Sequence, residues 1–196
     1  MLDLIESLDF LKKHKQAKWK IITKHRHLKN FHYPAFLKVD TNKHKSKIKA
    51  IESCKNLKEA EKNLVSLHKK FPKNKIIIQE KVEGLELIIG IKQEKVFGKI
   101  MLLGMGGTNT EKIKDVTFRK LPVSKNEIRS MLNDIKGIKS INKKNFAVKK
   151  LTKLIYKISK LAVKNKIIEM DLNPIILNKK NAFIVDARIS IQKEII

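Results

Sequence analysis

The stretch from Lys75 to Leu103 constrains the fold most strongly. It holds three closely spaced runs rich in β-branched and other apolar residues, Lys75–Val82, Leu85–Lys92 and Val96–Leu103, and glycines punctuate them. Further short apolar runs follow near the C-terminus. These patterns predict an antiparallel sheet in the second half of the chain.

Helices are expected among these strands. Apolar residues at helical spacing predict helices over about 4–11, 57–70 and 146–164, and Ser124 with Glu127 forms the capping box of a fourth. Additional strands are expected at Trp19–Thr23, Pro34–Val39, Val116–Lys120, Ile167–Leu172, Ile175–Leu177 and Ala182–Val185. No internal repeat or low-complexity linker is present. The predicted fold class is mixed α+β.

Charge is the second notable feature. The 196 residues carry 45 Lys and Arg against 19 Asp and Glu, a formal net charge of +26, and only four of the basic residues are arginine. When the chain is divided at residues 70 and 123, every part has a basic excess, which favours a lysine-rich background over a basic tail. Nucleic acid could bind through counterion release. However, aromatic residues make up only 6%, too few for a single-strand platform, so nucleic acid is not expected as a partner.

The cysteine and hydropathy patterns predict a cytoplasmic protein with no membrane partner. Cys54 is the only cysteine, which excludes an internal disulfide and a cysteine-based zinc site. The N-terminus lacks the pattern of a secretory signal, and no apolar run approaches the ~20 residues of a membrane span. His25, His27 and His32 are close in sequence, but without acidic partners at matching spacing they are expected to be surface residues.

The segment Glu169–Pro174 and the segment Asp186–Arg188 suggest a metal site. Two strands joined by a short turn would place Asn173 near the end of one strand and Asp186 on the next. Their oxygens could converge on Mg²⁺, which prefers such ligands together with phosphate oxygens. Two other readings stay open: Asn-Pro is a common turn dipeptide, and Asp186 with Arg188 could be a surface ion pair.

The order of segments resembles the ATP-grasp domain of ADP-forming acyl-CoA synthetases (acetate–CoA ligases), and more distantly the β subunit of succinyl-CoA synthetase. The similarity covers roughly residues 30–190. The matching pieces are Tyr33–Val39, His44–Ser46, Ile78–Val82, Gly84–Gly90, Phe97–Gly98, Gly104–Gly107, Asp115–Arg119, Glu169–Pro174 and Val185–Arg188. The resemblance implies one ATP-grasp unit over 1–196, with two α+β lobes, approximately 18–80 and 81–196, and a nucleotide cleft between them. It also implies ATP or ADP and Mg²⁺ as cofactors.

The resemblance assigns roles to nine residues. Nucleotide-binding positions match Lys38, Glu80, Val82 and Glu86, and magnesium ligands match Asn173 and Asp186. The catalytic positions are His44, Asp171 and Arg119. In this scheme His44 carries a phosphoryl group between subunits, Asp171 faces the partner's phosphohistidine, and Arg119 supplies a guanidinium. For Lys38, Glu86 and His44, the alternative readings are an edge residue, a solvent-facing strand residue and a solvated loop histidine.

The chain departs from the family pattern in the loop after His44. The family continues after His-Lys-Ser with an aspartate and a phosphate-cradling glycine pair, whereas this chain has Lys47–Ile51 without glycine. The chain also lacks a glycine fingerprint for CoA. The expected function is therefore the β subunit of an ADP-forming acyl–CoA ligase, which needs a CoA-binding α subunit and passes phosphate through His44 to ADP. The alternative is a non-catalytic ATP-grasp remnant with a structural or polyanion-binding role.

Overall fold

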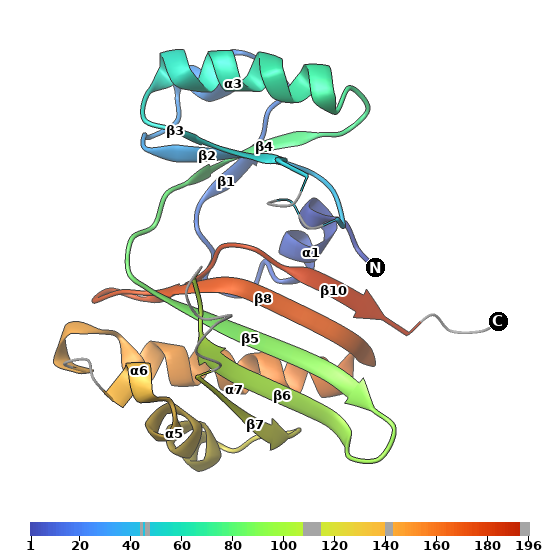
Figure 1. Ribbon diagram of the computed structural model, residues 1–196, viewed down its shortest axis with the longest axis vertical. Helices are drawn as coiled ribbons and strands as arrows, with labels where there is room; N and C mark the ends of the chain where they lie inside the picture. The colour runs from blue at the N-terminus through green and yellow to red at the C-terminus, as the bar shows by residue number, and fades with distance from the viewer. Residues whose placement is uncertain (44, 46–47, 108–114, 140–142, 193–196) are drawn as a thin grey trace. The chain divides into compact units, whose positions relative to one another are not determined.

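The computed structural model describes residues 1–43, 45, 48–107, 115–139 and 143–192 (Figure 1). The chain divides into two compact units. The smaller unit comprises Asp3–Glu6 and Ala17–Val82, and the larger unit comprises Met1–Leu2, Ser7–Gln16 and Glu83–Ile196. The helix α1 (Leu4–Phe10) contributes residues to both units.

The smaller unit is a four-stranded antiparallel sheet with a helix on one face. The strand order is β1 (Trp19–Ile21), β4 (Ile76–Glu80), β2 (Ala35–Val39) and β3 (Ile51–Cys54). Alternate residues of β2 and β4 pack with α3 (Leu57–Lys70) and the short α2 (Arg26–Lys29) into one buried cluster. The Asn56 side chain accepts a hydrogen bond from the Glu59 N–H and so caps α3.

The larger unit is built on a six-stranded antiparallel sheet. Its strand order is β10 (Arg188–Ile191), β8 (Ile167–Leu177), β5 (Leu85–Glu94), β6 (Gly98–Met105) and β7 (Val116–Lys120), and β9 (Ala182–Ile184) also pairs with β8. Three helices, α5 (Lys125–Asp134), α6 (Lys136–Lys139) and α7 (Val148–Lys164), lie on one face of this sheet (Figure 1). A short 3₁₀ turn, Lys143–Asn145, precedes α7.

A buried apolar layer joins the helices to this sheet. Leu87, Ile89 and Ile91 on β5 alternate toward it and are at most 2% exposed. Leu151, Ile155 and Ile158 of α7 are fully buried. The same face of β7 carries Thr117 and Arg119, which contact α5. The helices α5–α7 thus cover one face of the sheet and leave its opposite face to other contacts.

The predicted mixed α+β class and antiparallel sheet are confirmed, as is the capping box of Ser124 and Glu127. One prediction is wrong. Residues 167–177 form a single strand, β8, rather than two strands joined by a turn. The pairing of β8 with β5 shifts by one residue between Leu87 and Ile89, which accommodates the Asn173–Pro174 step as a bulge. Asp186, which was expected on a strand, lies between β9 and β10, outside any strand.

Within the described residues, none of the helices has both the length and the apolar character needed to cross a membrane.

Candidate functional site

The pairing of β8 with the C-terminal segment brings the predicted metal ligands opposite each other. Ile175 of β8 is paired with Ile184 of β9, and Asp171 of β8 is paired with Arg188 of β10. Between these pairs, the Val185 N–H donates to the Pro174 carbonyl at 3.3 Å. The register is the same on both sides of the segment between these two pairs. It therefore places Asn173 opposite Asp186.

Asp171 and Arg188 stand next to this pair. The Arg188 Nη2 lies 4.0 Å from the Asp171 Oδ2, and these side chains are 18% and 35% exposed. At this distance and exposure the ion pair contributes little to stability. Its effect is instead to hold a guanidinium and a carboxylate together beside Asn173 and Asp186.

Glu86 lies on the same face of the sheet as Asp171. Gly90 of β5 pairs with Asp171, and Glu86 is four residues from Gly90 along an alternating strand. The glycine pair after β6 packs against Glu86. The Gly106 N–H donates to the Glu86 carbonyl at 2.7 Å, and a Cβ on Gly106 would approach the Glu86 carbonyl carbon to 3.0 Å. Gly107 has a φ of +98°, which favours glycine, and lies beside the Glu86 carboxylate.

Arg119 lies on the other face of the sheet. Cross-strand partners point the same way, and Arg119 is in the row of Met101, Ile91 and Met170, all buried toward the helices. Asp171 is in the neighbouring row with Gly90 and Leu102, which points the opposite way. The structure thus separates Arg119 from Asp171, Asn173 and Asp186.

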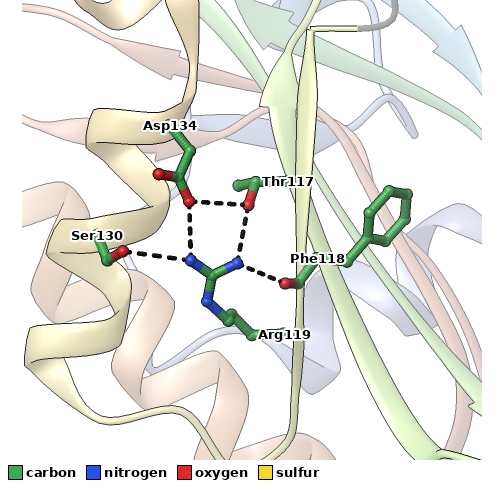
Figure 2. Close-up of polar contacts among 5 residues, drawn as sticks. All are labelled: Thr117, Phe118, Arg119, Ser130 and Asp134. Carbon is green, nitrogen blue, oxygen red and sulfur yellow. Dashed lines mark hydrogen bonds and ion pairs between the residues drawn. The ribbon is translucent and has the colours of Figure 1, made fainter.

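The guanidinium of Arg119 is occupied by contacts between β7 and α5 (Figure 2). Its Nη2 donates to the Asp134 Oδ2 at 2.8 Å and to the Ser130 Oγ at 3.2 Å. Its Nη1 donates to the Phe118 carbonyl at 2.8 Å and to the Thr117 Oγ1 at 3.1 Å. These contacts give Arg119 a structural role in joining α5 to the sheet; the catalytic role stays a prediction.

In the smaller unit, Lys38 lies on the face of the sheet opposite α3. It pairs with Ile77 of β4 and Ile51 of β3, whereas its neighbours Leu37 and Val39 point into the α3 core. Lys38 is only 3% exposed. A lysine at such a buried strand position is not the solvated edge residue that the alternative reading describes.

Glu80 and Val82 lie where the chain leaves the smaller unit, since the larger unit begins again at Glu83. The Glu80 Oε1 accepts a hydrogen bond from the Lys18 N–H at 2.7 Å, and the Glu80 N–H donates to the Lys18 carbonyl at 2.9 Å. The Glu80 carboxylate therefore fixes the start of β1. Its second carboxylate oxygen and the backbone of Val82 are the groups that the predicted nucleotide role would use.

Sequence reasoning assigned no role to two buried polar side chains of the smaller unit. Gln79 is fully buried, and neither its Nε2 nor its Oε1 has a hydrogen-bond partner among the described residues. It shares a face with Lys38 and lies between Trp19 and Phe36 in register. Lys45 is also buried, at 4% exposure. The sequence held one signal for Gln79, because it directly follows three isoleucines in β4.

His44, the predicted phosphoryl carrier, lies outside the described residues, as does Lys47. In the described part of the chain, no group of three or more His, Cys, Asp or Glu side chains could hold a metal by itself. Asn173 and Asp186 nevertheless fit Mg²⁺, which proteins often bind through one or two oxygen ligands while substrate phosphates and water complete the shell.

Comparison with known proteins shows the family of this chain. The model of the ATP-grasp domain family matches residues 23–191. The chain belongs to the ATP-grasp domain family. It is related to the β subunits of ADP-forming acetate–CoA ligases: it is 36% identical over 114 residues to the subunit β of acetate–CoA ligase (ADP-forming) II of Pyrococcus furiosus, covering 54% of this chain and 48% of that one.

This ATP-grasp domain also matches longer proteins. It is 30% identical over 171 residues to acetate–CoA ligase (ADP-forming) II of Archaeoglobus fulgidus, covering 82% of this chain and 25% of that protein. The chain thus spans between about a quarter and a half of the curated relatives it matches.

Solved structures show the same fold. A protein of Pyrococcus horikoshii superposes with a TM-score of 0.86 at 28% identity, covering 99% of this chain and 92% of that chain. An acetyl-coenzyme A synthetase of Ca. Korarchaeum cryptofilum superposes with a TM-score of 0.81 at 26% identity, covering 96% and 92%. That synthetase was in complex with coenzyme A and Mg-AMPPCP, with a phosphohistidine segment pointing towards its nucleotide-binding site.

Proposed function

We propose that this ATP-grasp domain is the nucleotide-binding β subunit of an ADP-forming acid–CoA ligase. The observation that carries the proposal is the register that sets Asn173 against Asp186 beside the Asp171–Arg188 pair, on the face of the larger sheet opposite α5–α7. Among the relatives, the Korarchaeum synthetase, which binds Mg-AMPPCP, supports a nucleotide as the ligand.

The residues would divide the work as follows. Asn173 and Asp186 would hold Mg²⁺, which neutralises phosphate charge and orients the β- and γ-phosphates when it is bound. Lys38 would contribute an ammonium to the phosphates. Glu80 and Val82 would contact the nucleoside. Glu86, whose position Gly106 and Gly107 fix, would also contact the nucleotide.

The proposed reaction consists of two phosphoryl transfers. The partner α subunit, charged by acyl-CoA and phosphate, would present a phosphohistidine. Its P–N bond would break as a neutral nitrogen of the His44 imidazole forms a new P–N bond. An ADP β-phosphate oxygen would then attack the phosphorus, the P–N bond to His44 would break, and a proton from water would return His44 to neutral imidazole as ATP forms. Asp171 would face the incoming phosphohistidine, and Arg188 would keep the Asp171 carboxylate in place.

The loop that lacks glycine is compatible with this function. The Ala50 N–H donates to the Lys45 carbonyl at 2.8 Å, and the Val39 N–H donates to the Ala50 carbonyl at 3.0 Å. Lys49, in the segment where the family has glycines, adopts a φ of +52°. The left-handed conformation that glycine would favour is thus present without glycine.

The test is a reconstituted assay. The chain is combined with the CoA-binding α subunit, acetyl-CoA or another acyl-CoA, ADP, phosphate and Mg²⁺, and ATP formation is measured. We expect ATP that requires both subunits, and we expect His44→Ala to abolish it while Mg-ADP binding persists. Mg-ADP binding without turnover for any acyl-CoA would overturn the catalytic proposal. It would favour the alternative of a non-catalytic ATP-grasp remnant.

A further inference from the structure

The solvent-facing side of α7 consists almost entirely of lysine. Six exposed lysines line it: Lys149, Lys150, Lys153, Lys157, Lys160 and Lys164. At 3.6 residues per turn these positions fall within an arc of about 100°, in a stripe about 22 Å long. The buried face, which includes Leu151, Ile155 and Ile158, points the other way. Among the described residues, none of the six lysines has an ion-pair partner.

Composition does not account for this stripe. Residues 135–168 contain eleven lysines and no aspartate or glutamate. The helix α3, of similar length, also carries lysines, but Glu59 and Glu61 are interspersed with them. A lysine-rich background therefore explains why lysine is frequent on α7. It does not explain why α7 and the residues that flank it carry no carboxylate.

The charge pattern of α7 also opposes helix formation. Lys149 and Lys150 occupy the first turn, where the helix dipole favours negative charge, and the N-cap Ala147 makes no side-chain cap. Like charges stand four residues apart at Lys149–Lys153, Lys153–Lys157 and Lys160–Lys164, an arrangement that weakens helices. The apolar face must hold α7 in place despite these charges. The stripe is therefore not explained by the stability of the fold.

The residue types exposed on α7 indicate which kind of polyanion it would bind. Interface cores between proteins are depleted of lysine and rich in aromatic residues, and membrane-binding helices present large apolar side chains. On α7 the exposed apolar residue is Val163, and the Tyr156 ring is covered by Lys125 and Lys160, whose Nζ atoms lie 5.6 and 5.7 Å from its centroid. Point charges without stacking groups or arginine forks suit a phosphodiester backbone rather than bases.

We propose that the lysine stripe of α7 binds the phosphate backbone of a nucleic-acid duplex without reading its sequence. This role goes beyond the proposed ligase function and uses none of its residues. It also modifies the expectation that nucleic acid is not a partner: the scarcity of aromatic residues argues against single-strand binding, and it leaves backbone binding to a duplex open.

The test compares two triple variants with equal charge change. K153Q/K157Q/K164Q removes three lysines from the stripe and keeps Lys160 over Tyr156, and K58Q/K62Q/K69Q removes three exposed lysines from α3. Binding to fluorescein-labelled DNA and RNA duplexes is followed by anisotropy over a series of KCl concentrations. Near physiological ionic strength, about 0.15 M, we expect the α7 variant to lose at least tenfold in affinity, and the α3 variant to lose much less.

The salt dependence gives a second readout. Each lysine that contacts a phosphate should contribute about 0.9 to the slope of log K against log salt, so each single α7 substitution should lower the slope by about that amount. Equal losses in the two triple variants, or no duplex binding at low salt, would overturn the proposal. Tighter binding to polyglutamate or to phosphatidylserine vesicles than to either duplex would also overturn it. Urea unfolding checks that the variants are folded, and because glutamine relieves like-charge repulsion we expect no loss of stability.

Discussion

The Arg119 Nη2 donates to the Asp134 Oδ2 at 2.8 Å and thereby joins the edge strand β7 to α5. Thr117 supports the pair, because its hydroxyl lies 3.3 Å from the same Asp134 oxygen. This network lies on the helical face of the larger sheet, away from Asp171. The most direct use of Arg119 in this molecule is thus to position α5.

Arg119→Lys should therefore destabilise the fold. Lysine cannot reproduce the fork that reaches Asp134, Ser130 and Thr117 together, so we expect the free energy of unfolding to fall by about 1–2 kcal/mol. Urea denaturation measures the change. The matched control is Arg129→Lys on the same helix, where the guanidinium bonds Asn126 within α5 and the expected change is small. Full stability of Arg119→Lys with lost turnover would instead favour the catalytic role.

His14 should make stability depend on pH. Burial, and then the nearby positive charge of Lys157, lower the pKa of His14 below its usual value, and its Nδ1 has no hydrogen-bond partner among the described residues. The folded state thus favours neutral imidazole, while the unfolded chain binds a proton near the ordinary pKa of about 6.5. The free energy of unfolding should be level above that pH and fall as the pH drops below it.

The urea midpoint at successive pH values tests this dependence. In His14→Phe the acid-side loss should be smaller than in the parent protein, because the ring can no longer take up a proton in the unfolded state. His68→Phe serves as the control, since His68 is exposed at the end of α3. An unchanged acid-side slope in His14→Phe would show that another group controls it.

At position 49, glycine should make the folded protein more stable than alanine does. Its φ of +52° costs about 1 kcal/mol for a residue with a Cβ, a cost partly offset by the greater freedom of glycine in the unfolded chain. We expect Lys49→Gly to be more stable than Lys49→Ala by about 0.5–1 kcal/mol. The comparison of the two variants cancels the loss of the lysine side chain. Equal unfolding midpoints would mean that position 49 does not need the left-handed conformation in solution.

The sequence predicted those parts of the fold whose pattern is local. The 14-residue α3, the capping box of α5 and the three runs between residues 75 and 103 all have clear periodicity or caps, and each is present. The strands β3 and β10 were not predicted. Ile51–Cys54 and Arg188–Ile191 are short and mix polar with apolar residues, so their strand character comes from pairing with β2 and β8.

The resemblance named the residues of the candidate site, but the sequence could not show how the fold arranges them. The register sets Asn173 opposite Asp186 through a bulged continuous strand rather than through a turn. Which face a side chain occupies depends on register, so the residue pattern alone could not show that Arg119 and Asp171 point to opposite faces. For Gln79, the preceding run of isoleucines indicates a strand position, but the lack of a hydrogen-bond partner for its amide among the described residues depends on the tertiary structure.

The central claim is that Asn173 and Asp186 hold a magnesium-bound nucleotide. It is tested most directly by calorimetric titration of the chain with ADP, in the presence of Mg²⁺ and in the presence of EDTA. The control is Glu169→Gln, which removes a carboxylate two residues from Asp171 on the same strand. We predict magnesium-dependent binding that Asp186→Asn and Asn173→Ala each weaken by tenfold or more, about 1.4 kcal/mol, and that Glu169→Gln preserves. Binding that is indifferent to Mg²⁺, or equally strong in Asp186→Asn and the parent protein, would contradict the account.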